Sequence, residues 1–197
     1  DISLLKNKKI IIINGDNAVF QKIASSYNLN YHDRNKLLST SESKSDDVIF
    51  DFLNIFQCDY VVWFNAIAPL QVNEDIKDFV KLLTSGRFTS LFAVKSNYIQ
   101  ALYKDLPINF SLNDKFSRTQ DLSPITSFVP SLMGWEAKTF LKNYLKSSYG
   151  FFSDNVGYYE NKFNLSSLVI KTEDDFKLIR SVIEGIKSYN NEVKYYL

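Results

Sequence analysis

The chain has 197 residues, which fits one domain with a sizeable core and leaves no room for a second full domain. Its 23 lysines and arginines nearly balance 22 aspartates and glutamates, so we expect neither nucleic acid nor an anionic membrane surface among its partners. No apolar run is long enough to span a bilayer and no charged leader opens the chain, which predicts a cytoplasmic protein.

The first elements alternate between strand and helix. Residues 8–14, KKIIIIN, are a β-branched run that predicts a strand. A helix should follow, with Val19, Phe20, Ile23, Ala24 and Tyr27 on one face. After a polar loop at residues 35–45, a second helix should begin near Ser45 and bury Ile49, Phe52, Leu53 and Phe56.

The segment from Asp59 to Gly86 predicts a strand, a loop and a helix. DYVVWFN is continuously apolar, as in a strand from the middle of a parallel sheet with helices on both faces. The helix should start at Asn73 as its cap, bury Ile76, Phe79, Val80 and Leu83, and stop at Gly86. Ligands of open α/β sheets bind beyond the carboxyl ends of the strands, so the loop Asn65–Gln71 should line a crevice.

The second half is less regular. From Phe88 the pattern predicts short strands and turns with one helix, Glu136 to Lys146. The sequence LSSLVI predicts a last strand, and Thr172 with Asp175 begins a helix that should bury Phe176, Ile179, Ile183 and Ile186. We predict a single α/β domain over residues 1–197, with an irregular β-rich insertion at about 88–135.

Cysteine and histidine are each present once. Cys58 alone excludes an internal disulfide and a multi-cysteine zinc site, and its place before a strand favours a buried small hydrophobic residue over a nucleophile. His32 alone excludes a two-histidine metal site, and we interpret it as a loop or strand-end residue.

Four segments, in this order, resemble the cytidylyltransferases that make CMP-activated acidic sugars, the acylneuraminate and keto-deoxy-octulosonate type. IIINGDNAVFQKIASSYNL is similar to the family's V-V-S-T-D-D-E-E-I-A-E-V-A-K-K-Y-G-A, and VVWFNAIAPLQVNEDI is similar to its V-V-L-L-Q-P-T-S-P-L-R and helix start. SRTQDLSPI resembles R-R-Q-D-L-P-P-V, and SSLVIKTEDDF resembles S-I-D-I-D-T-E-E-D-F. The resemblance covers nearly the whole chain.

The resemblance implies a three-layer Rossmann-like nucleotidyltransferase fold with a mostly parallel central sheet and a small β-rich dimerisation region. It implies CMP transfer from CTP to an acidic nonulosonate sugar, with release of pyrophosphate, Mg²⁺ in the site, and a homodimer. The positions that match the family's substrate-binding motifs are Asn65, Gln71, Arg118, Gln120, Asp121 and Lys171.

The chain departs from the family at the positions that bind phosphate, metal and substrate. KKIIIIN matches the family's second strand, so the first strand and its phosphate loop have no counterpart after Asp1. The two metal-binding aspartates fall on Val169 and Lys171, neither of which can ligate Mg²⁺. The family's Gln and Arg become Asn65 and Gln71, and its Asn-Gly becomes the pair at 129–130, so we assign no catalytic residue.

Each candidate residue also has an ordinary structural interpretation. Asn65 and Gln71 could contact a ligand, or be solvated loop residues that cap the next helix. The trio Arg118, Gln120 and Asp121 could contact a ligand or hold a turn through an ion pair.

Three further charged positions carry the same pair of alternatives. Asp16 could be a catalytic carboxylate or a helix cap. Asp174 and Asp175 suit the first turn of a helix without any metal. Lys171 could point to solvent, or offer a fixed positive charge to a phosphate or acidic sugar.

Two functions remain open. The chain is either a nucleotidyltransferase completed by an N-terminal segment, or a catalytically inactive relative that serves as a sugar- or nucleotide-binding or dimer-forming module. The missing phosphate loop and metal carboxylates favour the second, because each contributes to stabilising charge in the transition state.

Overall fold

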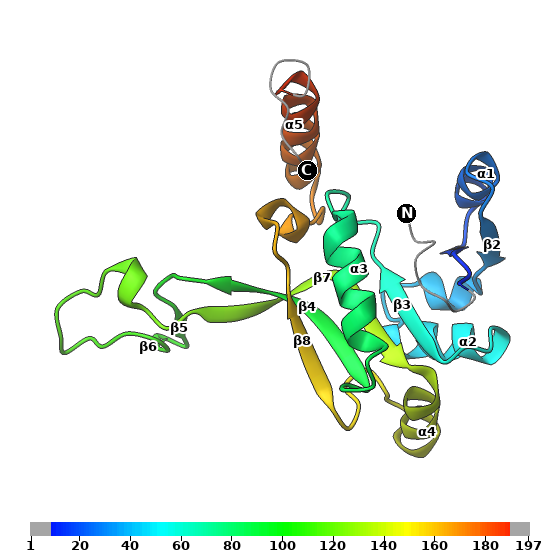
Figure 1. Ribbon diagram of the computed structural model, residues 1–197, viewed down its shortest axis with the longest axis horizontal. Helices are drawn as coiled ribbons and strands as arrows, with labels where there is room; N and C mark the ends of the chain where they lie inside the picture. The colour runs from blue at the N-terminus through cyan, green and yellow to red at the C-terminus, as the bar shows by residue number, and fades with distance from the viewer. Residues whose placement is uncertain (1–8, 190–197) are drawn as a thin grey trace. The chain divides into compact units, whose positions relative to one another are not determined.

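The computed structural model describes residues 9–189, which divide into two compact units (Figure 1). Of the described residues, 9–59 and 137–153 belong to the first unit, and 60–136 and 154–189 belong to the second. Within the described residues, no helix is both long enough and apolar enough to cross a membrane. The interpretation of the chain as a single domain stays a prediction.

The first unit opens with a strand, a helix and a second strand. β1 (Ile12–Gly15) and β2 (Asn30–Asp33) pair in parallel, and α1 (Ala18–Ser26) connects them. The predicted strand therefore starts later than residue 8, which lies outside the described residues. His32 lies near the end of β2, as predicted, with its ring edge against Phe52 and Phe56.

The start of α1 corrects one prediction. Asn17, not Asp16, is the N-cap, because the Asn17 side chain accepts a hydrogen bond of 2.9 Å from the backbone N–H of Val19. Asp16 instead lies 3.9 Å from the guanidinium of Arg34. On the predicted apolar face of the helix only Ala24 is buried, whereas Val19, Phe20, Ile23 and Tyr27 are exposed.

Two helices pack together in the rest of the first unit, after the short 3₁₀ helix η2 (Lys36–Ser39). α2 (Ser45–Ile55) begins at the predicted residue, and α4 (Ala137–Ser147) matches the predicted second-half helix within one residue at each end. The rings of Phe50 and Tyr144 stack at 4.1 Å between the two helices.

The second unit contains a mixed four-stranded sheet in the order β3-β7-β4-β8. Its strands are β3 (Tyr60–Phe64), β4 (Ser90–Asn97), β7 (Ile125–Glu136) and β8 (Val156–Glu160). β7 is antiparallel to both neighbours and β4 is parallel to β8, so β3, β4 and β8 point the same way. The predicted α/β class is confirmed, and within this sheet three of the four strands run in one direction, although two of its three pairings are antiparallel. In the first unit the pair β1 and β2 is parallel.

Three details of the sheet differ from the sequence prediction. β3 lies at one end of the four-stranded sheet rather than in its middle. Residues 88–135, expected to hold short strands, contain most of the two longest strands, β4 and β7. LSSLVI is not a strand: residues 164–167 form the 3₁₀ helix η4 (Asn164–Ser167), and the last strand is β8.

α3 (Asn73–Leu83) covers the core of the second unit. Phe79 and Leu83 of this helix are fully buried against Leu91 and Leu132 of the sheet. The expected cap, Asn73, is the first residue inside the helix, and Val72 occupies the N-cap position without a side-chain cap. Gly86 follows the helix with φ of +75°, a backbone conformation that favours glycine.

An irregularity in β7 lies beside the carboxyl end of β3. The register with β4 shifts between Phe92, which faces Met133, and Val94, which faces Phe128. Pro130 lies in the extra residues, where a missing N–H breaks no ladder hydrogen bond. The bulge therefore explains how proline fits within a long strand.

Residues 98–124 join β4 to β7 and are called the arm below. The arm contains the hairpin β5 (Leu102–Tyr103) with β6 (Leu106–Pro107) and the 3₁₀ helix η3 (Thr119–Asp121). Figure 1 shows it leaving the sheet at the ends of β4 and β7. The last element of the described residues is α5 (Glu173–Tyr189), where Ile179 is buried but Phe176 is 47% exposed.

Candidate functional site

The loop that follows β3 is held by backbone bonds at its start. The N–H of Asn65 donates to the carbonyl of Ser131 in the β7 bulge at 3.0 Å, and the Asn65 side chain accepts from the N–H of Ile67 at 3.3 Å. The carbonyl of Ile67 accepts a 2.8 Å bond from the N–H of Ile170. These bonds bring the predicted residues Asn65, Gln71 and Lys171 to one region of the second unit.

A buried carboxylate fixes the first turn of α3 to the end of β8. Asp75 is 0% exposed and accepts hydrogen bonds from the Tyr159 hydroxyl at 2.9 Å, the Lys162 N–H at 3.0 Å and the Ser166 hydroxyl at 2.9 Å. Burial, and then the bond to Asp75, raise the pKa of Tyr159 well above its ordinary value. The phenol therefore stays protonated and keeps donating to the carboxylate.

Further polar groups surround η4. The Asn161 side-chain nitrogen lies 3.4 Å from the Ser131 hydroxyl and 3.5 Å from the Ser166 carbonyl, and both are long contacts. Oδ1 of Asn161 and the hydroxyl of Ser167 are buried without a hydrogen-bond partner. Buried polar atoms without partners are uncommon in folded proteins, so we expect water or a ligand to bind in this region.

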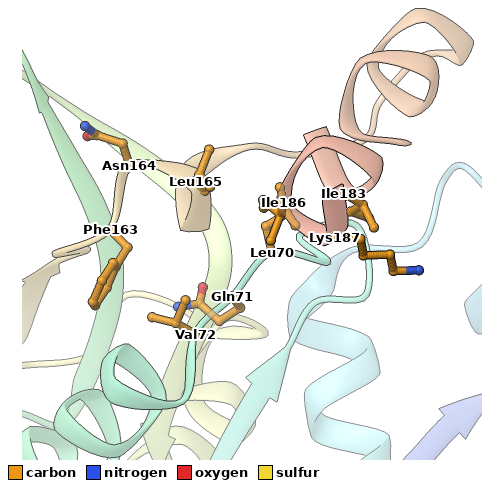
Figure 2. Close-up of a pocket in the computed structure, with 9 residues that line it drawn as sticks. All are labelled: Leu70, Gln71, Val72, Phe163, Asn164, Leu165, Ile183, Ile186 and Lys187. Carbon is orange, nitrogen blue, oxygen red and sulfur yellow. The ribbon is translucent and has the colours of Figure 1, made fainter. Parts of the chain in front are cut away.

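A pocket of about 310 Å³ opens between the loop after β3, η4 and α5 (Figure 2). All of its walls come from the second unit. The lining residues are Leu70, Gln71, Val72, Phe163, Asn164, Leu165, Ile183, Ile186 and Lys187. Most of these side chains are apolar, so the pocket suits a ligand with an apolar or aromatic body.

Gln71, one of the lining residues, has an unusual side-chain amide. Both Nε2 and Oε1 are buried and neither has a hydrogen-bond partner. Figure 2 shows Gln71 between Leu70 and Phe163. Asn65 differs, because its side-chain oxygen already accepts a bond from the N–H of Ile67 within the loop; it does not cap the next helix, α3, whose N-cap position is Val72.

The residues at the family's metal positions do not fit a divalent cation. Val169 packs against the hydrophobic core of the second unit, and the Lys171 side chain is exposed. Oδ2 of Asp175 accepts bonds from the N–H groups of Lys171 and Thr172 and from the Thr172 hydroxyl, at 2.8–3.0 Å. Among residues 9–189, no group of three or more His, Cys, Asp or Glu side chains is placed to hold a metal ion.

These bonds, first of all the backbone bond from Lys171, lower the pKa of Asp175. The carboxylate is therefore ionised at neutral pH and positioned as a helix cap. Asp174 lies in the same first turn, as predicted, and its carboxylate is 3.4 Å from the Lys177 ammonium. Asp175 caps the start of α5, and Asp174 interacts favourably with the helix dipole, as their positions in the sequence indicate.

The trio Arg118, Gln120 and Asp121 lies in the arm. The Arg118 guanidinium forms two bonds with the Asp121 carboxylate, at 2.7 and 3.2 Å, and both side chains are largely exposed. Gln120 is exposed as well. The local ion pair foreseen as one alternative is present, and the ligand contact stays a prediction.

Cys58 corrects another expectation, because it is exposed rather than buried. Partial desolvation of the thiol, and then the nearby Asp59, raise its pKa. A raised pKa lowers the thiolate fraction at neutral pH, so the environment does not activate Cys58 as a nucleophile.

Sequence reasoning missed the Asp75 cluster. A signal was present, since Asp75 lies four residues before Phe79 and eight before Leu83, on the buried stripe of α3. An acidic residue on such a stripe needs hydrogen-bond donors. The donors Tyr159 and Ser166 could not be found the same way, because β8 and η4 were not predicted.

The chain matches no protein-family model and no curated protein sequence. It is similar in structure to a 4-diphosphocytidyl-2C-methyl-D-erythritol synthase from Anaerococcus prevotii, with a TM-score of 0.64, 14% identity, and coverage of 93% of this chain and 82% of that one. A CMP:2-keto-3-deoxy-manno-octonic acid synthetase, solved with CTP, gives a TM-score of 0.63 at 7% identity over 92% and 83% of the two chains. The bifunctional IspDF from Campylobacter jejuni gives 0.56 at 11% identity over 86% and 41%.

At these identities the similarity shows the fold alone, a Rossmann-like α/β fold that this chain shares with the matched structures. Function in such folds depends on the residues of the site, and the same scaffold supports different chemistry.

Proposed function

We propose that this protein is an acylneuraminate cytidylyltransferase-like binding protein, which uses the scaffold to bind a nucleotide such as CTP or an acidic sugar without transferring the CMP group. The fold and the pocket at the carboxyl ends of the strands support binding. The alternative, a working transferase, requires groups that the described residues do not supply.

The observation that carries the proposal is the chemistry of Val169 and Lys171, which occupy the family's metal positions. Val169 is packed against the core, and Lys171 has an exposed cationic side chain. Mg²⁺ requires oxygen ligands in near-octahedral geometry, so these side chains cannot replace a pair of metal-binding aspartates. Without the cation, one contribution to stabilising the charge on a transferring phosphoryl group is lost.

Lys171 is a residue of this region that suits an anion. Lys171 is exposed and directly follows Ile170, whose N–H donates a hydrogen bond to the carbonyl of Ile67 in the loop after β3. A fixed positive charge there would attract a phosphate or a sugar carboxylate without a metal. Arg118, Gln120 and Asp121 would belong to the site only if the arm contacts the ligand.

The proposal includes a homodimer formed through the arm. Large apolar side chains of the arm are exposed, with Leu106 at 68%, Leu112 at 69% and Phe116 at 80%. Monomeric proteins rarely leave so many apolar side chains uncovered in one segment. A second copy of the chain is the partner that would cover them.

Calorimetric titration with CTP, CMP and sialic acid, each with Mg²⁺ and with a chelator, tests the proposal. We expect binding of at least one of these ligands that does not depend on Mg²⁺, and no release of pyrophosphate when CTP and sialic acid are combined. Lys171→Ala should weaken the binding, whereas Lys177→Ala, on α5, should not. Binding of none of the three ligands would refute the proposal, and CMP transfer would establish the transferase instead.

A further inference from the structure

The pocket of Figure 2 has apolar walls that the protein itself covers only in part. Its accessible surface is almost entirely apolar, and the two polar atoms of the Gln71 amide are buried, where a ligand in the pocket does not reach them. The apolar side chains of the lining are all half-buried, and they are Leu70, Val72, Phe163, Leu165, Ile183 and Ile186. An apolar ligand would remove this surface from water, which is favourable.

The isoleucines of α5 extend the apolar surface beyond what the protein buries. Ile179, Ile183 and Ile186 are spaced four and three residues apart, so they lie on one face of the helix. Ile179 is only 3% exposed, whereas Ile183 and Ile186 line the pocket. An amphipathic helix normally turns its whole apolar face toward other apolar groups. Packing within the described residues accounts for Ile179, and an apolar ligand would account for the other two.

A positive charge lies at the edge of this pocket. Among the described residues that line it, Lys187 is the only charged one, and its side chain is exposed. Figure 2 shows the Lys187 ammonium pointing away from Gln71. A lysine in this position covers apolar surface with its stem and keeps its charge in water. An anionic head group at the mouth of the pocket would therefore be attracted, and a cationic one would be repelled.

We propose that this pocket binds a small monocarboxylate with an aliphatic or aryl body, the body against the apolar walls and the carboxylate beside Lys187. The volume of about 310 Å³ lies at the lower end of the range of roughly 300–1,000 Å³ found for small-molecule pockets, so a body of about six to eight carbon atoms suits it. The inference does not rest on the proposed function, because the phosphates of a nucleotide and the hydroxyls of an acidic sugar need polar partners outside these walls.

Titration of the full chain with hexanoate, heptanoate and octanoate tests the body of the ligand, with the methyl NMR signals of Leu165 and Ile183 as the readout. We expect saturable shifts, and binding that tightens about threefold to fourfold for each added methylene. The methyl signals of Leu178, which is 56% exposed on α5 and outside the lining, should not shift. Equal affinity for the three acids, or the absence of saturable shifts, would overturn the inference.

Octylammonium, which keeps an apolar chain and reverses the charge, tests the head group. We expect octanoate to bind about fivefold more tightly, the size of effect that an exposed ion pair gives. Lys187→Met keeps an apolar stem and removes the charge, so it should abolish this preference while the gain per methylene remains. Lys177→Met is the matched control on α5, because Lys177 pairs with Asp174, and it should retain the preference. An unchanged preference in Lys187→Met would overturn the assignment of the head group.

A second pair of variants tests the wall itself. Ile186→Glu places a carboxylate on the apolar surface and should abolish octanoate binding, whereas Leu178→Glu on the same helix should not. Thermal unfolding checks that both variants are folded. If a second copy of the chain covers the walls instead, the methyl signals will shift with protein concentration and not with octanoate, which would overturn the inference. A failure of CTP and sialic acid to bind would refute the proposed function without affecting the octanoate result.

Discussion

The hydroxyl of Tyr159 donates a 2.9 Å hydrogen bond to Oδ1 of Asp75, and both residues are buried. The bond joins α3, on one side of the sheet, to β8, and the Ser166 hydroxyl extends it to η4. One carboxylate thus positions the elements that form two walls of the pocket. A carboxylate that accepts three hydrogen bonds in the interior has no solvent to replace any of them.

Asp75→Ala should lower the free energy of unfolding by about 2–4 kcal/mol, because it leaves buried donors on Tyr159 and Ser166 without an acceptor. Urea unfolding of the variant measures this loss. Asp78→Ala is the control on the same helix. Asp78 pairs with Lys162 at a largely exposed site, so its loss should cost about 1 kcal/mol or less. Equal losses for the two variants would contradict the role assigned to Asp75.

Gly134→Ala should destabilise the second unit by about 1–3 kcal/mol, because an added Cβ would come within 2.6 Å of Leu83 and force α3 away from the sheet. Gly185→Ala is the matched change in α5, where nothing lies within 4 Å of the new methyl group. It should stabilise the helix by about 0.5–1 kcal/mol. Thermal unfolding of the two variants should therefore shift in opposite directions, and shifts of the same sign would contradict this packing.

Elements with a strong periodic pattern could be predicted from the sequence. The apolar stripe of α3 includes Phe79 and Leu83, both of which are buried as predicted. β8 could not be found in this way, because Gly157 interrupts its pattern as a turn residue would. The structure gives a reason for this glycine: an added Cβ would come within 2.4 Å of the Phe88 ring.

The candidate site was predicted only in part. The rule that ligands bind beyond the strand ends located the loop Asn65–Gln71, and a pocket does include Gln71. The unpartnered state of the Gln71 amide could not be predicted, since it depends on how η4 and α5 pack over the loop. For Arg118 the resemblance indicated a ligand contact, and the structure shows an ion pair with Asp121. This ion pair is compatible both with ligand contact and with a purely structural role in the turn.

Asp175→Ala should lower the free energy of unfolding, because the first turn of α5 loses the acceptor for the N–H groups of Lys171 and Thr172. The lowered pKa of Asp175 adds a pH dependence. Its contribution is complete above the unfolded pKa near 3.8 and is lost as the pH falls through the lower folded value. Asp174→Ala, at a 93% exposed side chain, should change stability little. Unfolding measured at neutral and acidic pH tests both statements.

Replacing Leu112 and Phe116 together by serine should convert the proposed dimer into a monomer, because both apolar side chains are exposed in the arm. Sedimentation equilibrium measures the mass. The matched control replaces Leu37 and Leu145 in the first unit, which are 75% and 74% exposed, and should leave the association unchanged. A wild-type chain that sediments with one protomer mass at high concentration would refute the dimer.

Tyr144 should make the stability of the first unit sensitive to alkaline pH. Its hydroxyl donates a 2.6 Å bond to the Asp47 carboxylate, and this bond together with partial burial raises its pKa from 10.0 to about 12. Only the protonated phenol can donate, so the stabilisation is complete below pH 10 and is lost as the pH rises from 10 toward 12. Tyr159, whose pKa is also raised, contributes in the same direction to the stability of the second unit. Tyr144→Phe should therefore reduce the decline in unfolding free energy over this range without abolishing it. Denaturant unfolding at several pH values measures the two slopes, and identical slopes would show that Tyr144 ionises in the folded protein as easily as in the unfolded chain.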